Sequence, residues 1–293
     1  MKRAAGDGDS EEFEKKRARR RLICMQIDDF IDEIKLPDAQ RNKLEELAST
    51  VKSLIYVAKE MKKAHQVCDL KNLQSANIQF PVLLPFGLDL SKIESSCDCR
   101  WIHPAKIEIA GSWRSGYQTK DEPVMDLIII MPRNYFGSHD YQNFTYFIKR
   151  AHYLAQTAQI LIKAGLSVKF GTKQQDPLKP VLIVFNSDAL ESEGYLRLDF
   201  VPQRSFAKIS KFRPENNNLL PSFCSTQFDS LDSNIPTPIY NSKIAADLVR
   251  KEMEAKFEEF FRENSNFSRA YIMVRSWMYR RGFAQVYLNI DNF

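Results

Sequence analysis

The sequence has no long apolar run and few cysteines, and both absences limit what the protein can be. No stretch approaches the roughly 20 apolar residues of a membrane helix, so we expect no transmembrane segment and no membrane partner. The N-terminus lacks the apolar core of a secretory signal, and we expect none. The cysteines are odd in number and scattered, which favours a reducing compartment over a disulfide framework. They are Cys24, Cys68, Cys97, Cys99 and Cys224.

An excess of positive charge is also absent from most of the chain. The formal net charge of the 293 residues is +5, of which residues 1–21 contribute +3 and the rest only +2. Bulk charge therefore does not identify the body as a nucleic-acid-binding protein, and any RNA contact must come from a local patch. Apolar residues make up 44% of the sequence, which is enough for a sizeable core in a soluble protein.

Residues 1–21 are predicted to be a disordered tail, because small and charged residues dominate them. Seven consecutive positions of the tail hold six basic residues, namely Lys15, Lys16, Arg17, Arg19, Arg20 and Arg21. Such a run is typical of a nuclear import signal, because extended Lys and Arg side chains can occupy acidic grooves on an import receptor. A solvated basic surface or a non-specific RNA tether is the alternative.

Apolar periodicity predicts two N-terminal helices within residues 22–74. The first ends at Pro37, and the second begins near Asp38 and continues to about residue 64. The second helix carries an apolar stripe with alternating steps of three and four residues, formed by Leu44, Leu47, Val51, Leu54, Ala58 and Met61. We expect this stripe to pack on the chain's own body or on the first helix, and a partner-binding coiled coil is the alternative.

Residues 75–215 alternate between strand and helix patterns, which predicts an α+β domain. Strands are expected at 106–109, 124–131, 166–170, 180–185 and 194–201, with an amphipathic helix at 141–164. Residues 216–240 are polar and interrupted by prolines, which predicts a linker loop. Two further helices, at about 242–264 and 267–281 with Gly282 as C-cap, begin a helical domain at 241–293.

One constellation suggests chemistry: Gly111 and Ser112 follow the first expected strand, and Asp126 lies in the next one. In polymerase-β-type nucleotidyltransferases a Gly-Ser pair opens a helix whose N–H groups approach a triphosphate. An Asp-x-Asp pair in the next strand then points two carboxylates to one side, where they hold two Mg²⁺ ions. A third acid comes from a later strand, for which Asp199 is the candidate. We expect the strands of Asp126 and Asp199 to be neighbours, with both carboxylates on one side of the sheet.

The second acid of that signature is missing, because its position holds Ile128. Isoleucine cannot coordinate a metal ion, and loss of the bridging ligand removes much of the charge stabilisation on which metal catalysis depends. We therefore expect an inactive enzyme without cofactor or metal, in which Asp126 and Asp199 are vestigial and bond locally. An active enzyme could recruit Asp121 or Glu122 instead, but both precede the strand, where the geometry is poor.

Four stretches of the chain resemble the Nrap family, also called nucleolar protein 6. They are residues 111–113 with 124–133, 149–155 (KRAHYLA), 236–241 (PTPIYN) and 274–282 (VRSWMYRRG). They occur in the family's order and spacing over about residues 75–285. The resemblance implies a nucleotidyltransferase-like domain followed by a poly(A)-polymerase-like helical domain. We expect the chain to be a fragment, since Phe293 follows soon after the first helices of that second domain.

The resemblance also implies a function and partners. Family members are non-catalytic scaffold components of the small-subunit processome in the nucleolus, so pre-rRNA processing and ribosome biogenesis are the expected roles. The expected partners are pre-rRNA or a small nucleolar RNP, and processome subcomplex proteins that include casein kinase 2. The basic run adds an import receptor. A helical protein-interaction adaptor that uses the 38–64 stripe, and an active RNA nucleotidyltransferase, are the alternative functions.

Three residues near the start of the α+β domain could form a zinc site. Cys97, Cys99 and His103 are potential zinc ligands, but no fourth ligand follows at a customary spacing, so we expect no metal site.

The polar residues of the 149–155 stretch, Lys149, Arg150 and His152, could line an RNA, although we favour a solvated helix face. Trp277 is expected in the core, because Val274 and Met278 share its helix face.

Overall fold

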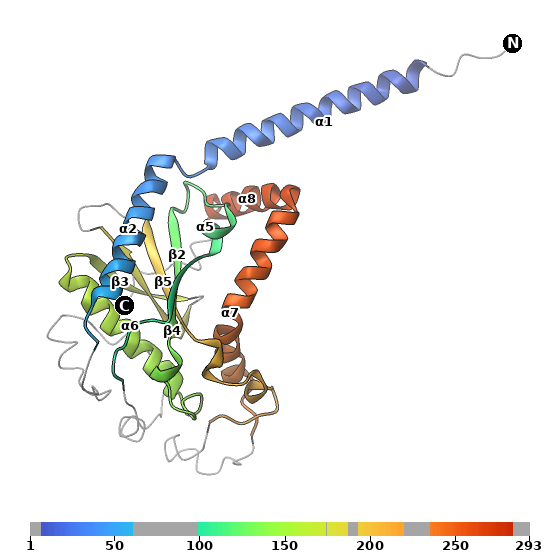
Figure 1. Cartoon of the computed structure of the whole chain (residues 1–293). Coiled ribbons are helices and arrows are strands. Elements are labelled where there is room, and N and C mark those ends of the chain that lie inside the picture. The colour runs from blue at the N-terminus through green and yellow to red at the C-terminus, as the bar shows by residue number, and fades with distance from the viewer. Residues whose placement is uncertain (1–6, 61–98, 174, 187–192, 220–234, 284–293) are drawn as a thin grey trace.

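The sheet forms from the apolar segments that the sequence predicts to be strands. They are β1 (Lys106–Ala110), β2 (Val124–Met131), β3 (Ser167–Lys173), β4 (Asp176–Phe185) and β5 (Tyr195–Pro202), in the order β1-β2-β5-β4-β3. β2 and β5 are parallel and the other pairs are antiparallel, so the sheet is mixed. The computed structural model describes residues 7–60, 99–173, 175–186, 193–219 and 235–283 (Figure 1).

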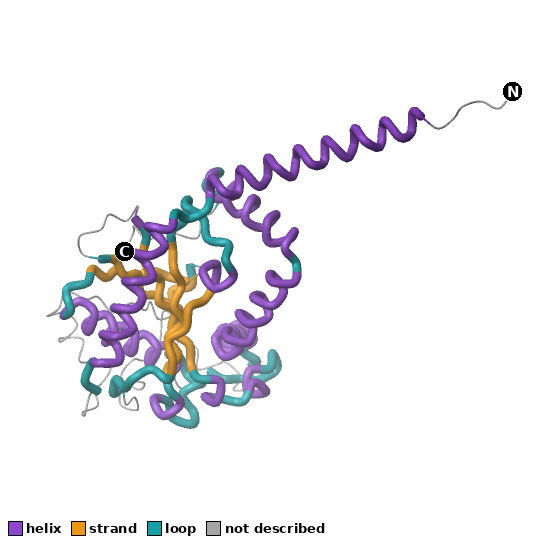
Figure 2. Tube along the Cα trace, turned by 45° about the horizontal axis from the view of Figure 1, so that its top comes forward, coloured by secondary structure: helices purple, strands orange, loops and turns teal. Residues whose placement is uncertain are grey.

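Helices cover both faces of this sheet, as expected for the predicted α+β class. α2 (Asp38–Val57) and α6 (Thr145–Lys163) lie on one side, and α5 (Gly111–Ser115) and α7 (Pro238–Glu263) on the other (Figures 1 and 2). α1 (Asp7–Ile34) precedes them and α8 (Ser265–Arg280) follows α7. Short 3-10 turns lie at Arg133–Tyr135, Arg204–Phe206 and Ile209–Phe212. None of the helices described has the length and apolar character that a membrane crossing requires.

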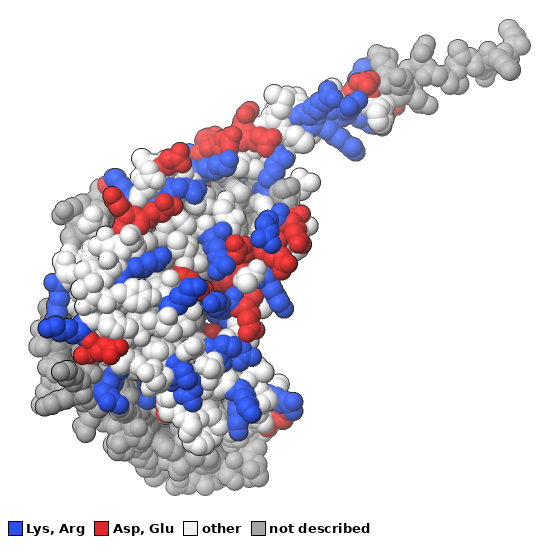
Figure 3. All heavy atoms as spheres, viewed as in Figure 1, with Lys and Arg blue, Asp and Glu red and all other residues white. Residues whose placement is uncertain are grey.

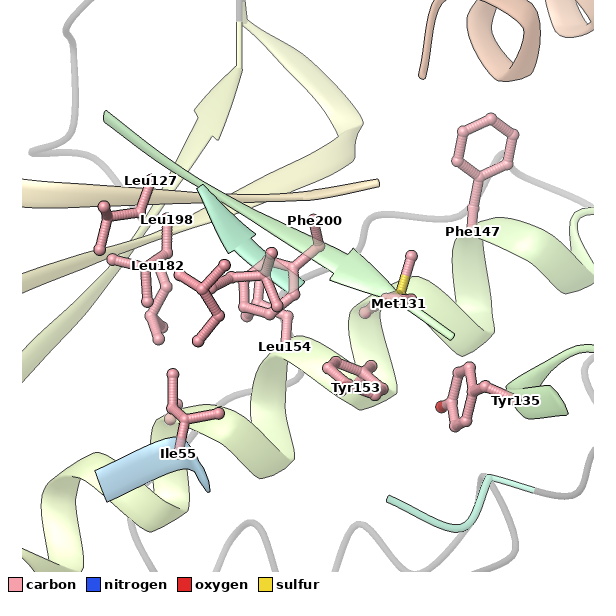
Figure 4. Packing of buried hydrophobic residues seen from close by; sticks show 14 of the residues in the cluster. Ile55, Leu127, Met131, Tyr135, Phe147, Tyr153, Leu154, Leu182, Leu198 and Phe200 are labelled. Carbon is pink, nitrogen blue, oxygen red and sulfur yellow. The ribbon is translucent and has the colours of Figure 1, made fainter. Parts of the chain in front are cut away.

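The two faces of β2 have different neighbours, because successive side chains of a strand point to opposite sides. Leu127 and its odd-numbered neighbours join the main core with Leu198 and Phe200 of β5, against Leu154 of α6 and Ile55 of α2 (Figure 4). Each such side chain contributes roughly 1.5–3 kcal/mol when it leaves water. The even-numbered residues of β2 therefore face α5 and α7, and that face carries the expected acids.

The stripe on α2 packs on the chain's own body, as we expected. Leu44, Ala48, Val51 and Ile55 are buried, and α2 contacts α6 and β5. The helix ends at Val57, earlier than the periodicity suggested, and residues 61–64 lie outside the described part of the chain. A coiled-coil partner would need this stripe exposed, so the structure contradicts that alternative for α2.

The prediction of disorder for residues 1–21 is wrong from residue 7 onward, because α1 begins at Asp7. Glu, Lys, Arg and Ala all favour helix, and Lys16 pairs with Glu12 one turn earlier at 2.7 Å. The side chains of residues 12–26 are exposed, as the charged composition of this segment would suggest. The C-terminal part of α1 is anchored, because Ile31 and Ile34 pack with Phe261 and Ile272 and Asp28 pairs with Arg269.

The expectation that Trp277 lies in the core is also wrong. Trp277 is 54% exposed and Val274 is 53% exposed, because α8 docks through its opposite face. There Ser276 donates a hydrogen bond to Asp121, and Arg275 forms an ion pair with Glu122. Periodicity identified an apolar stripe correctly but could not show which face the body covers.

The ends of α7 and α8 follow their sequence signals. Gly282 takes φ +76° and ends α8 as the expected C-cap, with the N–H of Phe283 donating to the carbonyl of Met278. α7 begins at Pro238, inside the predicted linker, of which residues 220–234 lie outside the described residues. The 236–241 stretch fixes this start, because buried Asn241 donates from its amide to the carbonyls of Arg213 and Asn216.

Tyr240 in that stretch joins α7 to the start of α6. Its phenol donates to the carbonyl of Tyr141 at 2.8 Å and accepts from the N–H of Phe144 at 3.1 Å. We expect Tyr240→Phe to lower the free energy of unfolding by about 1–3 kcal/mol, because two buried backbone groups lose their partner. Urea unfolding followed by circular dichroism measures this change. Tyr56→Phe, at a 46% exposed tyrosine, is the matched control. Equal stability of the two variants would contradict the prediction.

Candidate functional site

The candidate site begins where β1 turns into α5 beside β2. Gly111 takes φ +62°, and a Cβ there would lie 2.5 Å from Oδ2 of Asp126. Only glycine fits this turn, both for its backbone conformation and for the space beside the carboxylate. The Gly-Ser pair therefore forms a tight strand-to-helix turn that lies directly against Asp126.

The carboxylate of Asp126 forms an ion pair with an arginine of the neighbouring strand. The parallel register places Asp126 opposite Arg197 of β5. Nε of Arg197 lies 2.6 Å from Oδ1 and Nη2 lies 3.1 Å from Oδ2, so the guanidinium binds both carboxylate oxygens. The carboxylate raises the pKa of Arg197 and keeps it charged. Both oxygens that could coordinate a metal are thus used within the chain.

Asp199 is occupied by two cations. Nη2 of Arg150 lies 2.9 Å from Oδ1, and Lys173 of β3 donates to Oδ2. Burial by itself raises the pKa of the Asp199 carboxyl, but Lys173 and Arg150 outweigh burial and hold the pKa well below its ordinary value. Asp199 is therefore charged and fully paired with residues of its own chain.

Arg150 is the residue of this site that the sequence reasoning missed. Its side chain is 0% exposed, and it donates to the carbonyls of Phe200 and Pro180, each at 2.7 Å. Proline has no N–H with which to continue the pairing of β4 and β5, so the guanidinium binds the two strands at this point. A signal was present, because Arg150 lies three residues after Phe147 and four before Leu154, on the apolar face of α6.

The polar residues of the 149–155 stretch were expected either to line an RNA or to form a solvated helix face, and both expectations are wrong. Lys149, Arg150 and His152 are 4%, 0% and 3% exposed, so they form neither an RNA-facing stripe nor a solvated face. Nζ of Lys149 lies 2.7 Å from Asp140 and donates to the carbonyl of Tyr135. Buried cations of this kind are found where a carboxylate or carbonyls are available to pair with them.

The N–H of Gly111 at the Gly-Ser turn donates to a carboxylate of α7. Gly111 donates its backbone N–H to Oε2 of Glu254 at 2.9 Å, and Glu254 is buried beside Arg250. Arg114 of α5 pairs with Glu258 at 2.6 Å, and Lys251 pairs with Glu108 of β1 at 2.9 Å. The turn that would approach a triphosphate in an active enzyme here holds α7 against the sheet.

The position of the missing acid is apolar in three dimensions as well. Ile128 is 3% exposed and packs with Ala110, Ile130 and Val201. It lies opposite Asp199 in the β2–β5 register.

The two possible replacement acids are bound by α8 instead. Oε2 of Glu122 lies 2.6 Å from Arg275, and Asp121 accepts from Ser276 at 2.6 Å. This docking of α8 occupies both carboxylates and argues against a recruited acid.

The expected relation between the two retained acids is confirmed. Asp126 and Asp199 lie on adjacent strands of one mixed sheet, and Asp126 contacts Arg197, whose side chain points to the same side as that of Asp199 two residues on. Within the described residues, no three His, Cys, Asp or Glu side chains form a group that could hold a metal ion.

The weaker candidates do not join this site. Cys97 lies outside the described residues, and Cys99 is buried. His103 contacts Glu60 at 3.0 Å and the carbonyl of Ala58 at 2.8 Å. The basic run at 15–21 lies on the projecting part of α1, away from the sheet (Figure 1).

Sequence comparison relates the chain to one family. The model of "Nrap protein domain 1" matches residues 58–263. Nucleolar protein 6 of Xenopus laevis is 28% identical over 265 residues, which are 89% of this chain and 22% of that protein. Nucleolar protein 6 of Drosophila mojavensis is 28% identical over 181 residues, which are 60% of this chain and 15% of that protein. The chain thus matches between 15% and 22% of the length of these relatives.

Structural comparison finds only distant similarity. A structure described as "Structural Plasticity of Cid1 Provides a Basis for its RNA Terminal Uridylyl Transferase Activity" matches 61% of this chain and 35% of its own, with 15% identity and a TM-score of 0.30. A cytoplasmic RNA terminal U-transferase gives a TM-score of 0.27 over 61% of this chain and 34% of its own, with 16% identity. The arrangement of β1, α5, β2 and β5 itself matches the nucleotidyltransferase signature.

The charge pairs of the site lead to a stability prediction. We expect Asp199→Asn to lower the free energy of unfolding at pH 7 by about 3–5 kcal/mol, because it leaves the buried Arg150 guanidinium without its carboxylate. The depressed pKa of Asp199 contributes stability above about pH 4, and this contribution is lost as the pH falls toward the folded-state pKa. The difference in free energy of unfolding between the wild type and Asp199→Asn should therefore become smaller below about pH 4.

Urea titrations at several pH values measure both effects. Asp32→Asn is the matched control, since it breaks an exposed ion pair with Lys35 and should leave stability nearly unchanged. If Asp199→Asn were as stable as this control at pH 7, the buried pair would not have the role assigned to it.

Proposed function

The chain belongs to the Nrap family of nucleolar proteins, and from this premise we propose that it is a non-catalytic scaffold domain in small-subunit ribosome assembly. It would act in pre-rRNA processing as part of the small-subunit processome. The family match supports the ribosome-biogenesis role, because the relatives are named nucleolar protein 6. Since the chain matches less than a quarter of the length of those relatives, its partners belong to this proposal.

The bidentate pair of Arg197 with Asp126 carries the proposal of catalytic silence. A metal ion at Asp126 would have to displace a guanidinium that binds both oxygens in a charge-assisted pair. A metal at Asp199 would compete with Arg150 and Lys173, while Ile128 offers no bridging ligand at all. The chain's own cations therefore neutralise the charge that two Mg²⁺ ions neutralise in an active enzyme.

An active nucleotidyltransferase is the rival proposal, and the structure disfavours it. The available replacements, Asp121 and Glu122, hold α8 through Ser276 and Arg275. An adaptor that uses the α2 stripe is disfavoured too, because Leu44 and Val51 are buried on the body. The scaffold proposal needs neither a free acid nor an exposed stripe.

The proposed partners are pre-rRNA or a small nucleolar RNP, and processome subcomplex proteins that include casein kinase 2. An import receptor is the proposed partner of residues 15–21. Because the rest of the chain has a net charge of only +2, we propose that it contacts mainly proteins.

We predict that the purified chain incorporates no labelled nucleotide onto RNA with Mg²⁺ or Mn²⁺, because neither metal has a free set of ligands. Calorimetry should detect no two-site Mg²⁺ binding by the wild type or by Ile128→Asp, in which Arg197 still holds Asp126. Ile128→Asp combined with Arg197→Ala frees two carboxylates and should gain Mg²⁺ affinity. Asp126→Ala should leave RNA binding nearly unchanged. Nucleotide transfer together with two-Mg²⁺ binding by the wild type would disprove the proposal.

A second prediction concerns nuclear import. Replacing all six basic residues of 15–21 with alanine should shift a tagged protein toward the cytoplasm, as fluorescence microscopy can measure. The matched control replaces six exposed cations of the body, namely Lys43, Lys163, Arg204, Lys208, Lys211 and Arg213. Nucleolar accumulation of the first variant at the wild-type level would show that this run is not the essential signal.

A further inference from the structure

We propose that the basic band of α1, defined as residues 15–21, binds base-paired RNA as a helix, through phosphates on both sides of an irregular groove. The proposal rests on the RNA-binding part of the proposed function and names the surface responsible. α1 projects from the body, and the band forms a cluster of Lys and Arg on this projection (Figures 1 and 3). Residues 12–26 have exposed side chains, and α1 contacts the body through Cys24, Asp28, Ile31 and Ile34, which all follow the band.

The band surrounds the helix instead of forming one face. At about 100° per residue, its six cations cover roughly two thirds of the circumference. Ala18 is its only uncharged position, so the band has no apolar face. A helix that lies on a membrane or in a protein groove needs an apolar face to bury. A partner that presents negative charge on several sides at once fits the band better.

Repulsion within the band also favours an anionic partner. Three pairs of like charges lie four residues apart on α1: Lys15 with Arg19, Lys16 with Arg20, and Arg17 with Arg21. Such pairs destabilise a helix. The ion pairs of Lys16 with Glu12 and of Arg17 with Glu14 offset the repulsion only in part, because all four side chains are more than half exposed. Phosphates placed between the cations would remove this repulsion.

The dimensions of the band select base-paired RNA. Seven helical residues span about 10 Å, and a helix with its side chains is about 10–12 Å wide. A single RNA strand can contact only one side of such a helix, whereas the two phosphate backbones that border the groove of a base-paired stem can contact opposite sides of it. The major groove of regular A-form RNA is too narrow for side chains to enter. We therefore infer a stem with an internal loop or bulge that widens the groove.

The other cations near the nucleotidyltransferase-like site are already engaged. Arg197 is paired with Asp126, Arg150 and Lys173 with Asp199, and Arg250 with Glu254. This pairing leaves the band as the densest cluster of exposed positive charge in the described part of the chain. The import prediction concerns the same residues. An import receptor would bind them as an extended peptide, whereas the RNA groove would bind them as a helix.

The first experiment measures binding of the full chain to a fluorescent RNA hairpin with a central bulge. Replacing the six cations with alanine should weaken binding at least 30-fold in 100 mM KCl. It should also change the slope of log affinity against log salt from about −5 toward zero, since each phosphate contact contributes about −0.9. The six-cation body control defined above should bind like the wild type. Wild-type affinity of the band variant, or an equal loss in the body control, would overturn the proposal.

The second experiment tests whether RNA binding requires the helical conformation of the band in addition to its positive charge. Ala18→Pro keeps all six cations but interrupts the helix within the band. We expect it to weaken hairpin binding about tenfold and to leave binding to a uridine 30-mer nearly unchanged. Circular dichroism verifies the loss of helix. Hairpin binding equal to wild type would overturn the helical mode, and equal wild-type affinity for hairpin, uridine 30-mer and duplex DNA would overturn the choice of base-paired RNA.

A third measurement separates this inference from the proposed function. The band variant, supplied with an unrelated import signal, is tested for co-sedimentation with precursors of the small ribosomal subunit. Loss of hairpin binding with retained co-sedimentation supports both proposals and places assembly contacts on the body. Failure of the wild type to co-sediment would contradict the scaffold role, while its hairpin affinity would still decide the role of the band.

Discussion

The buried guanidinium of Arg150 joins helix α6 to strands β4 and β5 of the sheet. It reaches from α6 to the carbonyls of β4 and β5 where Pro180 has no N–H to offer, and to the carboxylate of Asp199. A fully buried cation is tolerated only with such partners, because the cost of removing it from water must be offset. Arg150 therefore attaches α6 to the centre of the sheet and, together with Lys173, keeps Asp199 charged.

The rest of the site follows the same physical logic. Each carboxylate retained on the nucleotidyltransferase-like face is paired with a cation of the chain, and the anion-binding turn at Gly111 is occupied by Glu254. The pairs place positive charge where an enzyme would place metal ions, so the face keeps its electrostatic balance without a ligand. Loss of the bridging acid at Ile128 is then one part of a wider change. Restoring that acid alone would still leave Asp126 bound to Arg197.

α7 and α8 dock on the body through apolar as well as polar contacts, since Ile244 and Leu248 of α7 join the main core and Ile272 of α8 packs with Phe261. Glu254, Glu258 and Lys251 hold α7, and Arg275 and Ser276 hold α8 through acids that precede β2. The covered side of α8 carries both Ile272 and Ser276, while Val274 and Trp277 face outward. α1 contacts α8 through residues that follow the basic band, from Cys24 to Ile34, and the side chains of the band are exposed.

The sequence by itself determined where the strands lie along the chain, the buried stripe of α2 and the glycine turn at Gly111. It also determined that the strands of Asp126 and Asp199 are neighbours. These features depend on local periodicity, on backbone conformation and on a signature with fixed spacing. It did not reveal that residues 7–21 are helical, that Trp277 is exposed, or that Arg150 is buried among backbone carbonyls. Only the tertiary structure decided these points, because which face of a helix is covered, and which cation reaches which carboxylate, depend on neighbours distant in sequence.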